Sequence, residues 1–156
     1  MRIVFGTDER TPVTDEVVED LRARGHDVRI VADGERWADV GRAVGEAVAS
    51  GDADRGVVCC WTGTGVSIAA NKVAGVRAAL CTDAETARGA RRWNDANVLA
   101  LGLRLTTAAL AEELLEAFLS TAPDEDERAN VEAVELVEPV EPVEPVEPVD
   151  GPAAAT

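Results

Sequence analysis

A cysteine followed by a glycine-rich turn is the part of this sequence best suited to chemistry. Residues 57–72 read VVCCWTGTGVSIAANK, in which an apolar run ends at Cys60 and glycines lead into a small-residue run typical of a helix. Such a turn exposes backbone N–H groups that suit a bound phosphate or an oxyanion formed during a reaction. A thiol beside these donors can lose its proton more readily than free cysteine, so Cys60 is a candidate base or nucleophile. The alternative is an inert core position, which strand alternation predicts for Cys59 on the opposite face.

Two nucleotide-binding fingerprints do not fit this stretch. Gly63 and Gly65 begin a GxG, but Ile68 stands where GxGxxG needs its third glycine. A Walker A loop needs Ser or Thr after a Gly-Lys pair, whereas Lys72 follows Asn71. The stretch is therefore interpreted as a thiol site beside an oxyanion nest and not as a nucleotide cradle.

The overall charge excludes a further class of function. The 156 residues include 30 acidic and 15 basic ones, giving a formal net charge of −15, and Lys72 is the only lysine. A surface of this kind repels phosphate backbones, so we expect no nucleic-acid partner. An acidic chain poor in lysine and in large aromatics resembles the proteins of halophiles, in which salt screens the repulsion between carboxylates.

Cysteine and histidine usage argues against a disulfide scaffold and against a metal or cofactor centre. The three cysteines are an odd set with no CxxC spacing, and there is one histidine. No stretch has the pattern of a signal peptide, and no apolar run approaches the roughly 20 residues of a membrane helix. The sequence thus predicts a cytoplasmic protein without metal, cofactor or membrane contact.

Strand-like and helix-like segments alternate along the chain, with Pro12 at the start of the first helix and Gly25 at its end. This alternation favours a parallel, doubly wound sheet with helices on both faces, in which ligands collect outside the carboxyl ends of the strands. Two such ends carry unusual residues, GTDER at 6–10 and CCWTGTG at 59–65. We expect strands at 2–6, 26–31, 55–60, 76–81 and 97–102, and helices at 12–25, 37–51, 65–73, 83–93 and 106–120.

A repeated Val-Glu-Pro triplet closes the chain, with VEPVEPVEPVEPVDGPAAAT after about residue 135. Each proline removes a backbone donor and blocks a helical turn, so polyproline-II structure or disorder is expected there. The prediction is one domain over residues 1–135 and an extended or disordered tail over 136–156.

Two runs resemble the signature region of ribose-5-phosphate isomerase B and the related galactose-6-phosphate isomerase subunits. They are TGTGVSIAANK at 62–72 and NDANVLA at 94–100, and the similarity extends, more weakly at both ends, from residue 1 to about 135. The resemblance implies a Rossmann-like three-layer α/β/α fold with a five-stranded parallel sheet. It also implies an obligate homodimer, or a tetramer, and a metal-free aldose–ketose isomerisation through an enediolate.

The resemblance assigns roles to particular residues. Cys60 matches the base in the cysteine-bearing branch of the family, and the hydroxyl of Thr62 would orient its thiol. The backbone amides around Gly63 and Gly65 would hold the developing oxyanion. The positions matched to substrate binding are Asp8 after the first strand and, reaching the site from the partner subunit, Asn94 and Arg104.

Several residues depart from the family pattern where the sugar would bind. Most members have a histidine after the first aspartate, where this chain has Glu9, and a ring-opening histidine at the position of Trp93. The remaining histidine, His26, is expected at a solvated turn. Trp61 replaces the first glycine after the base and narrows or caps the pocket, and Trp37 replaces a tyrosine that lines it.

The phosphate end of the site also departs from the pattern. The family places two arginines before a Val-Glu-Ala stretch, and these positions hold Asp126 and Asn130. Arg128 lies nearby and could substitute through a shift of the loop. Loss of one arginine–phosphate pair weakens binding by a few kcal/mol, so Arg104 and Arg128 are the candidates for holding a phosphate.

Three functions remain open from the sequence. The first is isomerisation of ribose 5-phosphate and ribulose 5-phosphate in the pentose phosphate pathway, with Glu9 assisting ring opening. The second is isomerisation of a shorter, open-chain or unphosphorylated sugar, which needs no ring-opening histidine. The third is a non-catalytic relative that binds a sugar metabolite or regulates another subunit.

Overall fold

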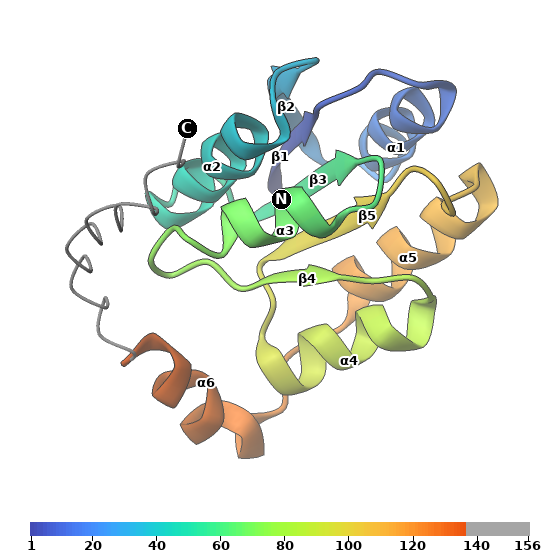
Figure 1. Cartoon of the computed structure of the whole chain (residues 1–156). Helices are drawn as coiled ribbons and strands as arrows, with labels where there is room; N and C mark the ends of the chain where they lie inside the picture. Colours follow the sequence, from blue (N-terminus) through green and yellow to red (C-terminus); the bar gives the residue numbers. More distant parts are fainter. Residues whose placement is uncertain (137–156) are drawn as a thin grey trace, which may run out of the picture.

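Five parallel strands form the centre of the structure, in the spatial order β2-β1-β3-β5-β4, with helices on both faces (Figure 1). The computed structural model describes residues 1–136. The three-layer α/β fold and the five-stranded sheet expected from the sequence are confirmed. The strands are β1 Arg2–Thr7, β2 Asp27–Asp33, β3 Arg55–Cys60, β4 Ala78–Leu80 and β5 Val98–Gly102. The helices are α1 Pro12–Ala23, α2 Trp37–Ala49, α3 Thr64–Ala70, α4 Ala84–Asn94, α5 Ala108–Ser120, a 3-10 helix Glu125–Glu127 and α6 Arg128–Glu135.

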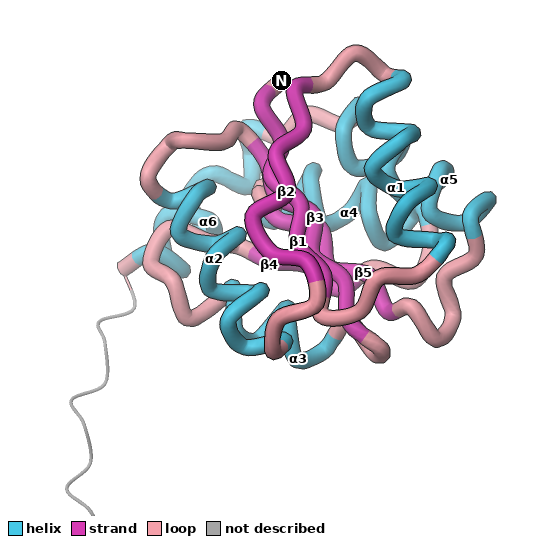
Figure 2. The backbone as a smooth tube through the Cα atoms, turned by 90° about the horizontal axis from the view of Figure 1, so that it is seen from above, coloured by secondary structure: helices cyan, strands magenta, loops and turns pink. Residues whose placement is uncertain are grey.

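The two faces of the sheet have separate cores. Seen from above in Figure 2, α1 and α5 lie on one side of the strands and α2 lies on the other. Successive residues of a strand point to opposite faces, so Cys59 is buried in the core under α1, α4 and α5, and Cys60 in the core under α2 and α3. The prediction that the two cysteines face opposite ways is therefore confirmed.

The first helix begins and ends where the sequence indicates. Pro12 occupies its first turn, and the Thr11 hydroxyl accepts a hydrogen bond from the Thr14 N–H at 3.3 Å, which caps one of the free donors there. The chain leaves the helix through Gly25, whose φ of +82° lies in the left-handed region that favours glycine.

The helix and the strand on either side of the connection 71–77 are both shorter than expected. The helix expected over 65–73 is α3, which ends at Ala70, and the strand expected over 76–81 is limited to Ala78–Leu80. The Asn71 side chain donates to the Ala78 carbonyl and accepts from the Ala78 N–H, both at 2.8 Å. This double hydrogen bond holds the connection in a tight turn.

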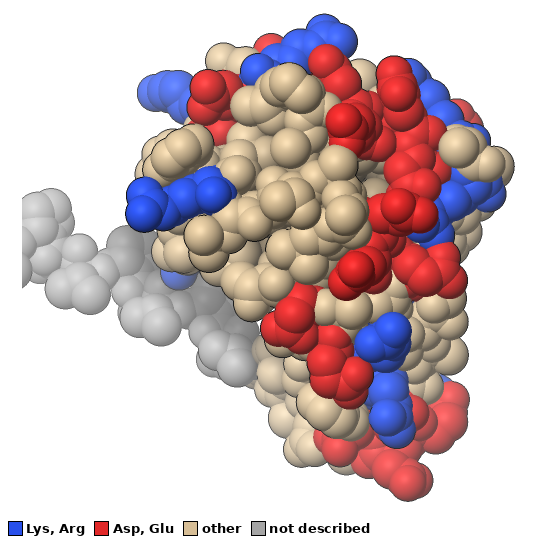
Figure 3. All heavy atoms as spheres, turned by 90° about the vertical axis from the view of Figure 1, so that its right-hand side faces the viewer, with Lys and Arg blue, Asp and Glu red and all other residues tan. Residues whose placement is uncertain are grey.

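The surface is acidic, as the composition requires. Acidic side chains form a broad band across the face drawn in Figure 3, with basic side chains beside it. Within residues 1–136, no helix is long and apolar enough to cross a membrane. The predicted Val-Glu-Pro tail lies outside the described residues, apart from its first residue, which follows α6.

Candidate active site

Cys60 ends β3 at the carboxyl edge of the sheet and is 5% exposed. Its sulfur accepts a hydrogen bond from the Gly63 N–H at 3.2 Å. A donor aimed at sulfur stabilises the negative thiolate more than the neutral thiol. The structure thus brings the predicted base and the predicted donor turn together within three residues.

The turn after Cys60 has its shape only because two of its residues lack side chains. Gly63 has a φ of +75°, and a Cβ there would lie 2.4 Å from the Leu80 side chain and 2.9 Å from the Gly102 backbone nitrogen. A Cβ on Gly65 would lie 2.9 Å from the ring of Trp37. The backbone of the turn is therefore packed directly against β5 on one side and an aromatic ring on the other.

The Thr62 hydroxyl lies 2.7 Å from the hydroxyl of Thr64, on the other side of the left-handed Gly63. Within residues 1–136 it makes no hydrogen bond to the Cys60 sulfur, so its role in orienting the thiol stays a prediction. The hydrogen bond that the sulfur receives comes from the backbone of Gly63 instead. Thr62 lies beside the site and presents its hydroxyl to the same turn.

Asp8 lies on the neighbouring strand end and carries an unsatisfied carboxylate. Its N–H donates to the Cys59 carbonyl at 3.3 Å, which ties the β1 loop to the end of β3. Its Oδ1 is buried and has no hydrogen-bond partner within residues 1–136. Burial raises the pKa of Asp8, and the nearby charge of Glu9 adds to this effect. A buried acceptor without a partner is poised for a ligand hydroxyl.

Glu9, Trp37 and Trp61 lie at the carboxyl edge of the sheet and are exposed. The Thr7 hydroxyl donates to the Glu9 carbonyl at 2.7 Å, and the Glu9 side chain is exposed. Trp61 is 56% exposed and Trp37 is 48% exposed. Trp37 and Asp8 line one open cleft of about 680 Å³. Two large aromatic rings thus flank the Cys60 turn.

Arg104 lies beside the Cys60 turn of its own chain. Its backbone N–H donates to the Trp61 carbonyl at 2.9 Å, and both residues line a cavity of about 100 Å³ together with Thr62. Within residues 1–136, the Arg104 guanidinium has no carboxylate within 4.0 Å. The resemblance expects Arg104 to act from the partner subunit, whereas the fold already places it at the carboxyl edge within one chain.

Trp93, Asn94 and Arg128 lie away from Cys60 within one chain. Asn94 ends α4 at the amino edge of the sheet, and β5 separates this edge from Cys60 by roughly 13 Å at about 3.3 Å per residue. Trp93 and Asn94 line a cleft of about 1090 Å³ with residues of α6. Arg128, at the start of α6, is exposed and pairs with Glu125 at 3.5 Å. A single copy of the chain therefore does not bring these three residues to the base.

His26 and Cys59 lie outside the site, whereas Cys81 lines the small cavity beside Thr62 and Arg104. His26 lies between α1 and β2, 3.5 Å from the N-terminal amine, and burial together with that amine lowers its pKa. Burial raises the pKa of Cys81 to about 12 and that of Cys59 still further. Among the described residues, Cys60 is the cysteine whose sulfur accepts a backbone hydrogen bond, from the Gly63 N–H.

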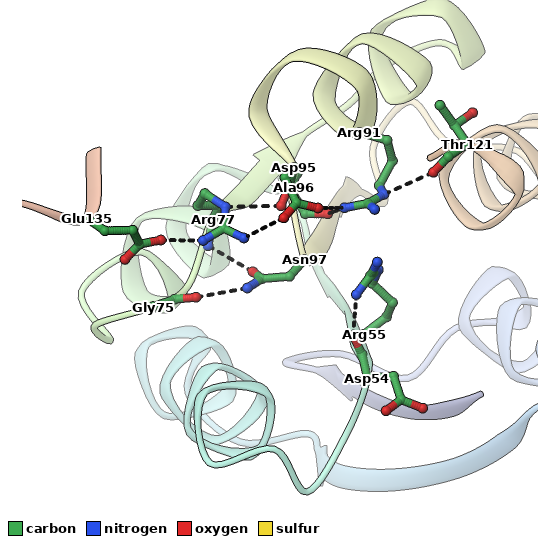
Figure 4. A network of polar contacts seen from close by, with 10 residues as sticks. All are labelled: Asp54, Arg55, Gly75, Arg77, Arg91, Asp95, Ala96, Asn97, Thr121 and Glu135. Carbon is green, nitrogen blue, oxygen red and sulfur yellow. Dashed lines mark hydrogen bonds and ion pairs between the residues drawn. The ribbon is translucent and has the colours of Figure 1, made fainter. Parts of the chain in front are cut away.

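Sequence reasoning did not find the ion pairs that support the second edge. Arg77 and Arg91 both pair with Asp95, the residue that follows Asn94 at the end of α4 (Figure 4). The one sequence signal was the run NDANVLA, which contains Asp95 but does not indicate which arginines contact it.

Comparison with known proteins places the chain among sugar isomerases. A family profile described as Ribose/Galactose Isomerase matches residues 3–135. Galactose-6-phosphate isomerase subunit LacB of Clostridium acetobutylicum is 41% identical over 126 residues, which cover 76% of this chain and 72% of the relative. D-erythrulose-4-phosphate isomerase of Pectobacterium atrosepticum is 43% identical over 83 residues, covering 53% and 55%. This chain thus matches about half the length of some curated relatives.

The solved structures lead to the same group. Ribose-5-phosphate isomerase B of Clostridium thermocellum superposes with a TM-score of 0.82 at 38% identity, covering 86% of this chain and 95% of that one. The matched part includes both edges of the sheet, since it spans nearly all of the described residues.

Proposed function

The chain belongs to the ribose/galactose isomerase family, and we propose that it interconverts an aldose phosphate and a ketose phosphate with Cys60 as the base. The observation that carries this proposal is the Gly63 N–H, which lies 3.2 Å from a buried sulfur at the carboxyl edge of the sheet. Cys60, Gly63 and Gly65 form one rigid unit there, because the turn excludes side chains at both glycines.

The reaction needs one base and one oxyanion site. The Cys60 thiolate takes a proton from the carbon next to the carbonyl, so that a C–H bond breaks, an S–H bond forms and the carbonyl oxygen becomes negative. Backbone N–H groups of the turn at Gly63 and Gly65 stabilise this enediolate. The hydroxyl proton on the adjacent oxygen then moves to the oxygen that was the carbonyl, and the thiol returns its own proton to the former carbonyl carbon, so that carbonyl and hydroxyl exchange positions. Asp8, with a free buried oxygen, accepts a hydrogen bond from a sugar hydroxyl.

We further propose that a second copy of the chain completes the site. Trp93 and Asn94 are too distant from Cys60 of their own chain, by roughly 13 Å along β5, to touch a small sugar bound there. In a symmetric dimer the same surface is available from the partner, with Arg128 at its margin. Whether dimers pair into tetramers is a separate prediction, as is the expected cytoplasmic location.

Ribose 5-phosphate is the first candidate substrate. The exposed Glu9 beside Asp8 assists ring opening, and the Arg104 guanidinium, which has no carboxylate within 4.0 Å among residues 1–136, binds the phosphate. Ribose-5-phosphate isomerases B are among the structural relatives at 38% identity.

A four-carbon or other open-chain sugar phosphate is the second candidate. The site contains no histidine to open a ring, since His26 lies beside the N-terminal amine. Trp61 and Trp37 occupy the mouth of the site, which favours a short substrate. Relatives at 43% and 39% identity are named D-erythrulose-4-phosphate isomerases.

The test is isomerisation of ribose 5-phosphate and of D-erythrulose 4-phosphate by the full chain in molar potassium chloride, because the net charge of −15 calls for screening. Cys60→Ser should lower kcat by about 10²- to 10⁴-fold, whereas Cys59→Ala, which changes a buried thiol on the opposite face of the sheet, serves as the matched control and keeps its activity. If the folded wild type is inactive on both sugar phosphates and on unphosphorylated sugars, the isomerase proposal fails. The non-catalytic hypothesis then remains.

A further inference from the structure

One arginine joins three elements at the amino edge of the sheet. The Arg77 guanidinium donates to the Asp95 carboxylate at 3.1 Å and to the Asp95 carbonyl at 3.0 Å, and it also pairs with Glu135 of α6. Figure 4 shows Arg77 between these two carboxylates. Arg77 therefore links the start of β4, the end of α4 and α6 through one planar group.

Asp95 holds an unusual backbone conformation at the point where α4 ends. Its φ of 42° makes it the only non-glycine residue with a positive φ within residues 1–136. Aspartate tolerates this region better than most residues but still at a cost of roughly 1 kcal/mol. The conformation persists because both carboxylate oxygens are held, one by Arg77 and the other by Arg91 at 2.7 Å.

Arg91 anchors the network from below. Its side chain is 2% exposed and also donates to the Ala96 carbonyl at 2.5 Å and the Thr121 carbonyl at 3.3 Å. Its guanidinium lies over the ring of Phe118, 5.7 Å from the centroid. The end of α4 is thus fixed to the buried core, and Arg77 extends this fixed point outwards to α6.

The residues immediately before Asp95 are the ones proposed to meet the substrate. Trp93 and Asn94 form the last turn of α4, and Asn130, Val131 and Val134 of α6 face them across the cleft of about 1090 Å³. Within residues 1–136, the link from Arg77 to Glu135 is the side-chain ion pair that joins α6 to the sheet. It therefore determines where the two walls of the cleft stand relative to each other.

We propose that Arg77 is a positioning residue, whose guanidinium binds Asp95 and Glu135 and so fixes the end of α4 and α6 as one rim for the active site of a second copy of the chain. This inference rests on the proposed isomerase function and on the proposed contribution of Asn94 across the dimer. Arg77 acts through these neighbours and does not itself touch the sugar.

Arg77→Met tests the proposal, because it keeps the aliphatic stem and leaves Asp95 paired with Arg91. The expected result is a KM for the sugar phosphate raised about ten- to a hundredfold, as for other groups displaced by about 1 Å, with a smaller change in kcat. Glu135→Gln weakens only the ion pair between Arg77 and α6, and it should raise KM less than Arg77→Met does. Arg88→Met is the matched control, since Arg88 pairs with Glu85 on the same helix and has no link to α6.

Mixed dimers distinguish a role in the partner's site from a general loss of stability. Arg77→Met and Cys60→Ser chains carrying different tags are co-expressed, and the mixed dimer is purified. One of its two sites combines an intact base with an intact rim, so about half of the wild-type kcat should return at the wild-type KM. A mixed dimer that stays as impaired as the Arg77→Met homodimer would overturn the proposal, as would an unchanged KM in Arg77→Met itself.

A fluorescence measurement tests the role of Arg77 without the isomerase assay. With Trp37→Phe and Trp61→Phe in the background, Trp93 is the remaining tryptophan, and its fluorescence anisotropy reports how firmly the end of α4 is held. Arg77→Met should lower this anisotropy, and Arg88→Met should not. If the wild type is inactive but Arg77→Met lowers the anisotropy of Trp93, the proposed function fails and the positioning role of Arg77 is supported. If Arg77→Met leaves the anisotropy unchanged, Arg77 does not position the end of α4.

Discussion

The carboxyl and amino edges of the sheet are built from different interactions. At the carboxyl edge, Cys60 is held by a backbone N–H three residues away, in a turn whose shape depends on Gly63. At the amino edge, Asn94 is held through ion pairs between residues 77 and 95 and between 77 and 135. The first edge is local and made of main chain, and the second is long-range and made of charged side chains.

This difference suits the two tasks proposed for them. Backbone donors cannot move without unfolding the turn, so they are suited to a reacting oxygen whose position must be fixed. Ion pairs between separate elements depend on single side chains, and those of Asp95 and Glu135 are 33% and 38% exposed. The amino edge is therefore the one whose position single side-chain substitutions can test without changing the backbone.

The largest effect is expected from Gly63→Ala at the carboxyl edge. The new Cβ would meet Leu80 at 2.4 Å and the backbone of Gly102 at 2.9 Å, in a left-handed conformation. We expect a loss of about 2–4 kcal/mol in the free energy of unfolding, from overpacking and backbone strain together, and a fall of at least about 100-fold in kcat/KM. Urea unfolding and the isomerase assay in molar salt measure the two.

Gly75→Ala is the matched control for this substitution. Gly75 has nearly the same φ, +79°, but no atom of the described residues 1–136 lies within 4 Å of its Cβ position. Strain alone should cost about 1 kcal/mol there. Equal losses in the two variants would show that close packing against β5 does not shape the Cys60 turn.

The carboxyl edge was largely predictable from the sequence, because its interactions are local. The order of strands and helices follows from apolar patterns, and the turn follows from Gly63 and Gly65, which come three and five residues after Cys60. The exception is Thr62, whose hydroxyl direction depends on the dihedral angles of Gly63 and could not be inferred from residue types.

The amino edge could not be predicted, because its partners are far apart along the chain. Arg77 and Glu135 are separated by 58 residues, and the chain offers many other acidic residues to any arginine. Arg91 and Asp95 are a local i,i+4 pair, but Arg77 lies 18 residues before Asp95, so their pairing does not follow from the sequence of α4. The start of β4 at Ala78 was likewise not predicted from the sequence. The Asn71 side chain, seven residues earlier, forms its double hydrogen bond with the Ala78 backbone at this point.

Asp95→Asn should have the next largest effect, at the amino edge. Asparagine tolerates the left-handed conformation but leaves the 2% exposed Arg91 without its carboxylate. We expect a loss of about 1–3 kcal/mol in the free energy of unfolding by urea. Asp39→Asn is the control, because Asp39 also pairs with two arginines but on the surface, where about 0.5 kcal/mol is expected. Similar losses in both would mean that burial of Arg91 adds nothing.

Asp8→Asn should have a smaller effect of the opposite sign on stability. Burial raises the pKa of Asp8 in the folded chain, so the ionised form opposes folding, and this cost appears as the pH rises through the raised pKa. The variant should therefore unfold at a higher urea concentration than the wild type at pH 7, and the difference should shrink towards pH 4. Its KM should rise, because the amide oxygen of asparagine is a weaker hydrogen-bond acceptor than the Asp8 carboxylate. A pH-independent difference in stability would contradict the role of ionisation.

The smallest effect is expected from Asp124→Asn, which tests whether any tether near α6 would serve. Arg92 contacts the Asp124 carboxylate at 2.9 Å, but both side chains are substantially exposed, and the Asp124 N–H also donates to the Arg92 carbonyl at 2.8 Å. Since the backbone bond survives the substitution, the free energy of unfolding should fall by about 0.5 kcal/mol or less. The KM should stay at the wild-type value, unlike that of Glu135→Gln. If Asp124→Asn and Glu135→Gln raised KM equally, then any ion pair along residues 124–135 would position α6. Arg77 would in that case have no special role in positioning the rim.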